Sequence, residues 1–384
     1  MRRPRSLLRQ TLTDTFKRPG ARFGACWLMV IVLMGVFAPL IASSHPILMK
    51  RDGSWSSPMW RNMSAVDVGL LGAFIFGCVW LLVRKASLGE SISVMALGFA
   101  VIFPISSLSK TVVKQDYYAI YREEQRTGQI TTAIRTIIPY SPSDRMRDMP
   151  ERRLTPPNIR NWLGTNGNAE DLLSGMIHAC RIALSVGLIS TSISLLIGIT
   201  VGGAMGYFVG KVDLFGMRLI EIFEAIPGLL LLITVMAAYG RGLYMMMAVI
   251  GLLGWTGTAR FVRAEFLRLR NQDFVQAAVA TGVSRIAIIF KHILPNGLTP
   301  VLVTATFGIA GAILTEATLS YLGLGLVDKP SWGRMLNDVR SGGQGFVWWM
   351  AIFPGAAIFL TVYSYALIGD SMRDALDPKL KKRD

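Results

Sequence analysis

Side chains that could carry out covalent or acid–base chemistry are sparse in this sequence and form no recognisable catalytic set. Histidine and cysteine each occur three times, at His45, His178, His292, Cys26, Cys78 and Cys180. They are scattered and include no CxxC pair, so they predict neither a metal site nor a disulfide framework. The segment 206–211 (GYFVGK) lacks the glycine spacing of a phosphate-binding loop, and no Ser or Thr follows its lysine. We therefore expect a chain that is not an enzyme and holds no metal or cofactor of its own.

Two glutamates draw attention because they fall within apolar stretches. Glu224 lies near the start of the run 219–239, three residues before Pro227, and Glu316 lies inside the run 298–322. A carboxyl group in a membrane span is costly and should face protein or water. Our hypothesis is that both groups face a translocation path. The alternative is a structural role, as helix caps or as partners in interhelical hydrogen bonds.

The elements that must position these groups are membrane-spanning helices. The chain has 384 residues, of which 52% are hydrophobic and 17% charged, and its mean hydropathy is +0.45. Apolar runs of about 20 residues recur, which predicts an all-α polytopic membrane protein. Eight spans are expected, at about 23–43, 65–83, 92–108, 182–209, 219–239, 243–258, 298–322 and 346–368.

Charge predicts the orientation of these spans. The net charge of +16 suggests a nucleic-acid partner, but much of the basic excess flanks apolar runs, where cytoplasmic loops carry it. We therefore expect membrane lipid and no nucleic acid. Both termini would be cytoplasmic: the basic, amphipathic segment 1–22 and the tail 371–384. Between them we expect an anchor span with two further spans over 23–108, an irregular extracytoplasmic loop over 109–176 and a core over 177–370.

Glycines recur every four residues in the expected fourth span. Gly198, Gly202, Gly206 and Gly210 form one stripe of small residues along a helix face. Such a stripe lets a second helix approach closely. It is typical both of an interface that slides and of tight static packing, and spacing alone does not separate the two.

A polar stretch between two expected spans, Arg270–Asn296, predicts a helical hairpin. Asn271 suits an N-cap and Asp273 suits the positive end of a first turn. Helical spacing then gives a narrow face of mostly small residues, namely Phe274, Ala277, Ala278 and Thr281. Arginines before the stretch predict that it is cytoplasmic. Spacing alone is equally consistent with an ordinary loop and with a knob that a partner grips.

The second half of the hairpin has its own start and stop signals. Gly282 suits a left-handed C-cap, and Ser284 suits the N-cap of a second helix. Pro295 is expected to stop that helix, because the residue before a proline disfavours the α region.

This stretch resembles the cytoplasmic EAA loop of bacterial ABC importer permeases. The matching residues are Gln276-Ala277-Ala278, Gly282 and the run His292–Asn296 (HILPN). The resemblance extends over about 159–378 and includes GKVDLFGMRLIEIFEAIPGLLLLI, GWTGTARFVRAEFLRLRNQDFVQAA and GAILTEATLSYLGLG. The chain resembles the second permease subunit of oligopeptide and dipeptide importers. Its long outer loop favours the branch that includes the microcin-type peptide permeases.

The resemblance implies a type I importer transmembrane domain, with a six-helix core and two extra helices. It implies a binding-protein-dependent permease in the bacterial inner membrane, which moves peptides or similar small solutes. The implied partners are two ABC ATPase subunits that bind ATP and Mg, a homologous permease and an extracytoplasmic solute-binding protein. The coupling loop would span 264–297, and the residues that would couple it to the ATPases are Asp273, Gln276, Ala277, Ala278, Gly282 and Pro295.

Some features depart from the family pattern or stay open. Gln276 stands where the family has a glutamate, which weakens any charge contact there to a neutral hydrogen bond. Asn166 and the pair Ala169-Glu170 depart from the outer motif and leave an ion pair there in doubt. The two extra spans are either a lipid-facing addition or a docking element. A stand-alone secondary transporter or channel is the alternative function. Peptides, nickel chelates, sugars and antibiotic peptides all remain open as substrates.

Overall fold

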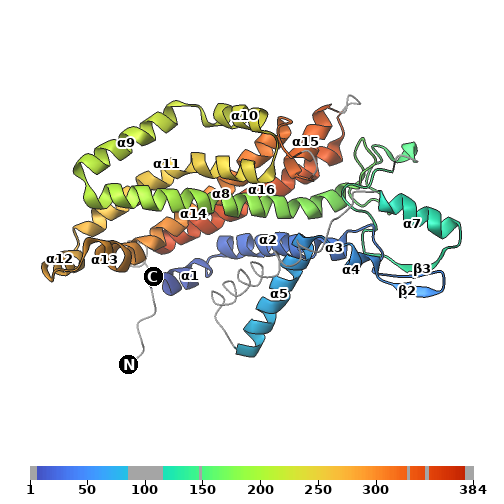
Figure 1. Cartoon of the computed structure of the whole chain (residues 1–384), viewed down its shortest axis with the longest axis horizontal. Coiled ribbons are helices and arrows are strands. Elements are labelled where there is room, and N and C mark those ends of the chain that lie inside the picture. Colours follow the sequence, from blue (N-terminus) through green and yellow to red (C-terminus); the bar gives the residue numbers. More distant parts are fainter. Residues whose placement is uncertain (1–6, 85–115, 147–148, 327–328, 342–345, 377–384) are drawn as a thin grey trace. The chain divides into compact units, whose positions relative to one another are not determined.

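The structure is a computed structural model that describes residues 7–84, 116–146, 149–326, 329–341 and 346–376 (Figure 1). The expected span 92–108 lies outside these residues. The chain divides into two compact units. The first comprises Met1–Met29, Ala183–Asn337 and Gly355–Asp384, and the second comprises Val30–Ile182 and Asp338–Pro354.

Helices build the first unit, and several of the long ones continue into the second. The helices in chain order are α1 (Leu7–Thr15), α2 (Pro19–Val36), α8 (Leu172–Phe208), α9 (Gly210–Ala225), α10 (Gly228–Tyr239), α11 (Leu243–Arg270), α12 (Asp273–Ala280), α13 (Arg285–Ala287), the π-helix η2 (Ile288–Ile293), α14 (Leu294–Tyr321), α15 (Trp332–Ser341) and α16 (Trp348–Leu376).

The second unit combines short helices with a small sheet. Its elements are α3 (Ala38–Ile41), β1 (Leu48–Arg51), β2 (Ser54–Ser56), α4 (Pro58–Arg61), α5 (Ala65–Arg84), α7 (Tyr117–Arg126), β3 (Ile130–Ile134) and the 3₁₀ turn η1 (Pro150–Arg152). The strand order is β2-β1-β3, and both pairings are antiparallel, with Lys50 opposite Trp55 and Met49 opposite Ala133.

The expectation of an irregular loop over 109–176 was therefore wrong in part, because α7 and β3 lie within it. β3 has five residues and pairs with β1, about eighty positions earlier. A strand this short shows little periodicity of its own, and its partner is distant in the sequence.

Six helices in the described part of the chain are long and apolar enough to span a membrane, and a bent pair makes up to seven. This confirms the expected all-α polytopic fold. The continuous span expected over 219–239 was wrong, because α9 and α10 meet at an angle of 71°. Ile226 is extended (φ −95°, ψ 126°) in front of Pro227, as the ring of a following proline requires.

The glycine stripe positions α8 against α11. A Cβ atom on Gly198 would lie 2.6 Å from the Thr258 side chain, and one on Gly206 would lie 2.6 Å from the Arg263 carbonyl oxygen. At Gly202 it would collide with the main chain of Ala259. The two backbones thus approach as closely as such a stripe allows. Gly210 does not share this packing, because α8 ends at Phe208 and Gly210 (φ +59°) begins α9.

Candidate functional site

The Arg270–Asn296 stretch forms the expected hairpin, with one change at its start. The N-cap of α12 is Gln272 (φ −80°, ψ 148°), so the expectation of Asn271 was wrong. Asp273 lies in the first turn of α12. The expected left-handed conformation of Gly282 is confirmed by its φ of +78°. The expected Ser284 cap is also confirmed, since its Oγ accepts a hydrogen bond from the Ala287 amide at 3.4 Å.

The pattern of burial along α12 differs from the single face of small residues that the sequence predicted. Val275 and Ala278 are buried and pack with Phe266 of α11 and Ile288 of η2. Ala277 and Phe274 are exposed, Phe274 to 41%. A single face that includes both Ala277 and Ala278 was therefore the wrong prediction, because the neighbouring helices select Ala278 for the core.

Apolar side chains remain exposed along the outside of this hairpin. We call Phe274, Ala277, Val279, Ile286 and Phe290 the hairpin surface. Ile286 is 70% and Phe290 62% exposed. A cluster of exposed apolar side chains is typical of a protein–protein contact.

The sequence predicted that Pro295 ends the second helix, and this prediction was wrong. The chain stays helical from Arg285 through the π-helix η2 and into α14. Pro295 falls in the first turn of α14. Because it has no N–H, it leaves one backbone hydrogen bond of this continuous helix unmade. The wider π turn precedes it, and the Leu294 amide bonds to the Ile289 carbonyl. The hairpin is therefore continuous with a membrane-spanning helix.

Gln276 makes a contact that a glutamate cannot make. Its Nε2 donates to the main-chain carbonyl of Arg270 at 3.0 Å, at the C-terminal end of α11. The Arg270 guanidinium in turn donates to the carbonyl of Tyr207 in α8 at 3.1 Å. Because a carboxylate has no proton to donate, the amide is suited to this position.

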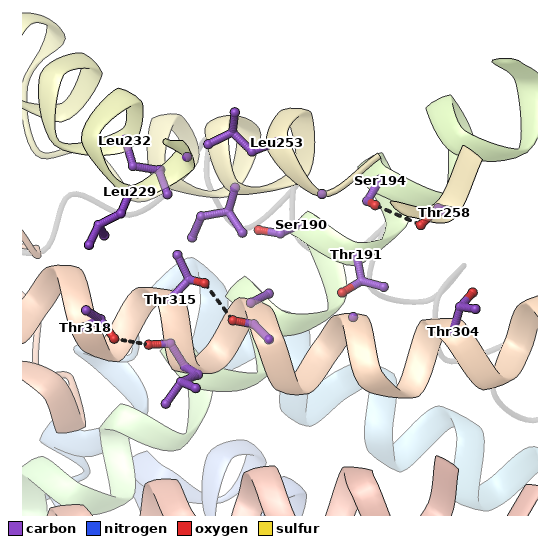
Figure 2. A pocket seen from close by; sticks show the side chains of 17 residues that line it. Ser190, Thr191, Ser194, Leu229, Leu232, Leu253, Thr258, Thr304, Thr315 and Thr318 are labelled. Atoms are coloured by element: carbon purple, nitrogen blue, oxygen red, sulfur yellow. Dashed lines mark hydrogen bonds between the residues drawn. The ribbon is translucent and has the colours of Figure 1, made fainter. Parts of the chain in front are cut away.

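A cavity of about 550 Å³ lies among α8, α10, α11 and α14 (Figure 2). Seven of the residues that line it carry a side-chain hydroxyl, namely Ser190, Thr191, Ser194, Thr258, Thr304, Thr315 and Thr318. Glycines and apolar side chains form the rest of the wall. None of the described residues that line the cavity is ionisable.

Most of these hydroxyls already use their proton. Thr304, Thr315 and Thr318 donate to carbonyls of their own helix at 2.7–2.8 Å, and Ser190 donates to the Met247 carbonyl at 2.9 Å. Ser194 and Thr258 share one hydrogen bond of 3.3 Å. Thr191 differs: it is 6% exposed, and its Oγ1 has no hydrogen-bond partner within the described residues.

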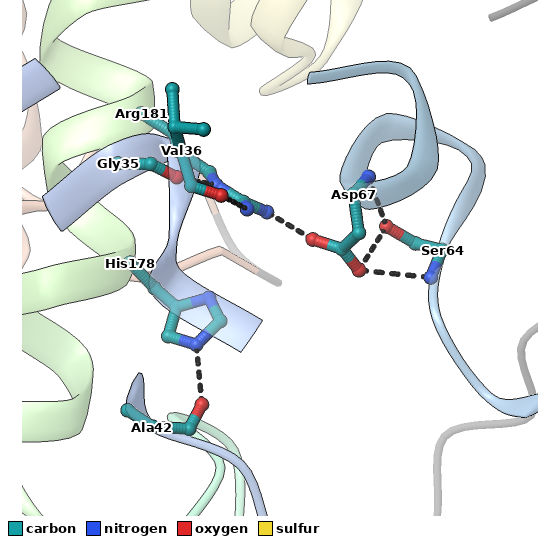
Figure 3. A network of polar contacts seen from close by, with 7 residues as sticks. All are labelled: Gly35, Val36, Ala42, Ser64, Asp67, His178 and Arg181. Atoms are coloured by element: carbon teal, nitrogen blue, oxygen red, sulfur yellow. Dashed lines mark hydrogen bonds and ion pairs between the residues drawn. The ribbon is translucent and has the colours of Figure 1, made fainter. Parts of the chain in front are cut away.

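The second unit has a charged network around Arg181 (Figure 3). Arg181 forms an ion pair with Asp67 of α5, and it donates to the carbonyls of Gly35 and Val36 at the end of α2. Asp67 also accepts hydrogen bonds from the amide and hydroxyl of Ser64, at 2.8 and 2.6 Å. Asp171, ten residues before Arg181, accepts a hydrogen bond from Asn161 at 2.7 Å.

A smaller cavity of about 180 Å³ in the same unit is lined by ionisable groups, among them His45, Asp67, Asp144 and His178. The His178 Nε2 donates to the Ala42 carbonyl at 3.0 Å. Burial lowers the pKa of His45 to about 4. Burial also raises the pKa of Asp144 to about 7, against opposing hydrogen bonds from the Ser141 amide and from Ser44.

Comparison with known proteins shows the family to which this chain belongs. Residues 198–382 match the family described as binding-protein-dependent transport system inner membrane component. Residues 6–58 match the N-terminal transmembrane domain of oligopeptide transport permease C. The inner membrane ABC transporter permease protein YejE of Escherichia coli K12 is 31% identical over 367 residues, which cover 94% of this chain and 95% of that protein. The chain belongs to this permease family.

Two further comparisons accompany this result. The dipeptide transport system permease protein DppC of Alkalihalophilus pseudofirmus is 38% identical over 233 residues, 60% of the present permease and 76% of that protein. Among solved structures, an inward-facing form of the MetNI methionine ABC transporter aligns with a TM-score of 0.42 and 18% identity. It covers 53% of the permease and 97% of the solved chain.

The two glutamates singled out by the sequence do not line the larger cavity of the permease. Glu224 at the end of α9 forms an ion pair with Arg260 of α11, and both side chains are partly exposed. Glu316 is 2% exposed and accepts a hydrogen bond from Ser320 at 2.6 Å. The structure therefore gives both carboxylates protein partners.

Sequence reasoning missed the cavity hydroxyls and the partner of Arg181. The cluster Ser190-Thr191-Ser192 within a long apolar run was the available signal for the first. Asp67 in the expected span 65–83 was the signal for the second, because an acid in a span calls for a partner. Neither signal says which helices meet.

Proposed function

We propose that this permease moves peptides across the bacterial inner membrane as one subunit of an ATP-driven importer. The observation that carries the proposal is the hairpin surface, which is exposed and apolar. Its members Ile286 and Phe290 lie on the helix that continues into α14. The relatives named above for dipeptide transport support peptides as the substrate class. The permease supplies the path, and partner chains supply the energy.

In this proposal each of two ABC ATPase subunits carries ATP and Mg, and one of them receives the hairpin surface in a groove. A homologous permease lies alongside, and an extracytoplasmic binding protein delivers the peptide. Both termini and the loop 264–297 are cytoplasmic. Asp273, Gln276 and Gly282 shape the hairpin, while buried Ala278 fastens α12 to the core. Pro295 lies where the hairpin joins α14, so movement of the hairpin would move a span.

We place the peptide path at the cavity among α8, α10, α11 and α14. Three of these helices are membrane spans, and α10 is half of a bent pair. Glu224 and Glu316 would border this path outside the cavity lining, as ion-pairing and hydrogen-bonding groups. The packing of Gly198, Gly202 and Gly206 on α11 would hold one wall of the path.

The docking role of the hairpin can be tested at Ala277, which is exposed and so can be changed without filling the core. Ala277→Glu should abolish ATP-dependent peptide uptake in cells and reduce copurification of the ATPase subunits, because it buries a charge in an apolar contact. Ala277→Ser is the matched control and should retain both. Ala278→Glu is unsuitable as a docking test, since it would disrupt the hairpin itself.

Normal uptake and normal copurification with Ala277→Glu would contradict the docking role. Uptake that continues when the ATPase subunits are removed would instead favour a stand-alone secondary transporter.

A further inference from the structure

We propose that the π-helix η2 is the hinge about which α14 tilts while the hairpin stays bound to its partner chain. The hairpin leads into α14 through η2, since the chain is helical without a break from Arg285 to Tyr321. This inference rests on the proposed function, because a hinge here matters only if a partner chain holds the hairpin. It names the part of the coupling loop that must bend.

The burial of two isoleucines shows what the π turn does to the helix. Ile288 and Ile293 are 1% and 0% exposed and belong to one core cluster with Phe266 of α11. On a regular α-helix, residues five apart point in directions about 140° apart. The i→i+5 hydrogen bonding of a π turn brings such residues to nearly the same side. The wider turn therefore lets both isoleucines pack in one cluster.

The same turn keeps the hairpin surface facing outward. Its members Ile286 and Phe290 are four residues apart and are 70% and 62% exposed. On a regular α-helix Ile293 would lie on their side, because it follows Phe290 by three residues. Ile293 is buried instead. The π turn thus separates an exposed apolar side before it from a buried apolar side after it.

Pro295 gives the π turn a physical cause. In a regular α-helix a proline ring clashes with the carbonyl four residues earlier, here that of Lys291, and a wider turn in front of the ring relieves this clash. Pro295 has no N–H to donate, and neither has Pro300, which lies inside α14. The backbone hydrogen bonding of this continuous helix is therefore weakened twice in a short stretch, and helices bend most readily at such places.

The segments on either side of this stretch have their own contacts with α11. Before it, Ala278 of α12 shares the core cluster of Phe266. After it, Gly297 lies close to α11, since a Cβ there would be 3.2 Å from Leu269 Cδ1. Farther along α14, Thr304 lines the larger cavity. A bend at η2 would therefore move α14, and with it one wall of the proposed path, relative to the hairpin.

The test removes the hinge but keeps both of its apolar sides. Deletion of Lys291 places Ile288 and Ile293 four residues apart, so a regular α-helix can bury both. The hairpin surface precedes the deletion and keeps its sequence. Pro295→Ala in the same chain restores the missing N–H. Lys291→Ala is the matched control, because it removes an exposed side chain and keeps the number of residues.

Three quantities are compared between these variants and the wild type. They are copurification of the ATPase subunits, ATP hydrolysis by the purified complex, and uptake of radiolabelled trialanine by cells that take it up only through this importer. The deletion variant should keep the first two and lose at least about tenfold in uptake, because a regular helix resists a change of angle between the hairpin and α14. Lys291→Ala should match the wild type in all three.

Hydrogen exchange tests the hinge in the unaltered chain, whatever the deletion does to assembly. The amides of 289–294 in the purified complex should differ at least about threefold in exchange rate between the nucleotide-free and the ATP-bound state. The amides of 305–313, farther along the same helix, should exchange equally in both states.

The hinge is refuted if the deletion variant takes up trialanine like the wild type. It is also refuted if the wild-type amides of 289–294 exchange equally in the two states. A failure of the proposed function would look different, because wild-type uptake would then continue without the ATPase subunits.

Discussion

The permease has two polar interiors that are built in opposite ways. The larger cavity, in the first unit, is lined by hydroxyls and contains no ionisable group among its described residues. The smaller one, in the second unit, is lined by histidines and aspartates. In the first, the three threonines of α14 bond to their own helix, while Ser190, Ser194 and Thr258 form hydrogen bonds between α8 and α11. In the second, side chains such as Arg181 bond to other elements.

The difference teaches what each region can do. The threonines of α14 bond within their own helix and join it to no other element, so they leave acceptors for a ligand. Ion pairs that join separate elements fix those elements, and Arg181 joins α8 to α5 and to the end of α2. Of the two extra spans expected over 65–108, α5 is the one that the structure describes, and this ion pair ties it to α8. Changes in the charged region should therefore affect stability, and changes in the neutral cavity should affect transport.

The largest effect is expected from Arg181→Ala. Its removal leaves Asp67 without its counter-charge in a site where both side chains are less than 15% exposed. Loss of one partner of a buried pair costs roughly 3–5 kcal/mol. Thermal unfolding of the purified chain should show a matching loss of stability. The double variant Arg181→Met with Asp67→Leu should recover part of the lost stability. Full stability of Arg181→Ala alone would contradict the role of the ion pair in holding α5 to α8.

The next largest effect concerns Asp144 and pH. Its raised pKa, about 7, means that the folded state holds a proton that the unfolded state releases near pH 4. Stability from this group is therefore present below about pH 4 and lost as pH rises to about 7, by at most about 4 kcal/mol. Asp144→Asn should abolish this slope, as measured by unfolding between pH 4 and pH 8.

The titration of His45 makes it necessary to compare Asp144→Asn with the wild type. Its lowered pKa, about 4, means that the unfolded state binds the extra proton, so this group makes stability rise between about pH 4 and pH 6.5. The two slopes oppose each other in the wild type. Only the difference between wild type and Asp144→Asn isolates the carboxyl group, and identical pH profiles would contradict its burial as an acid.

A smaller effect, on uptake and not on stability, is expected from Gly311→Leu. Gly311 lines the larger cavity, and a Cβ there meets no atom within 4 Å. The new side chain should fill the space that the peptide needs and lower uptake about tenfold, or ~1.4 kcal/mol. Gly257→Leu is the control, because Gly257 also has open space but does not line the cavity. Equal uptake by the two variants would remove the cavity from the path.

The smallest effect is expected from Gln276→Glu. A carboxylate cannot donate the hydrogen bond to the Arg270 carbonyl. Its negative charge is also repelled by the partial negative charge of that carbonyl oxygen. At this exposed position the cost should be about 0.5–1 kcal/mol. Hydrogen exchange of the α12 amides should become faster, while Gln276→Asn, which is one methylene shorter, should show an intermediate effect. Unchanged hydrogen exchange would mean that the hydrogen bond from Gln276 to the Arg270 carbonyl contributes nothing to the stability of α12.

The sequence by itself determined the class of the molecule and much of its local structure. Apolar runs located the spans, because a helix must be apolar over about 20 residues to cross the bilayer. The caps at Gly282 and Ser284 were also readable, since they depend on neighbours within four residues. The glycine stripe from Gly198 to Gly206 predicted close helix packing but not its partner.

The tertiary structure decided what depended on distant partners. The side of α12 that is buried is set by Phe266 and Ile288, so the sequence could not choose between Ala277 and Ala278. The partner of Arg181 lies more than one hundred residues away, in α5. Local helical spacing does not encode which helices meet. Hydroxyl-bearing residues of α8, α11 and α14 line one cavity only because packing brings these helices together.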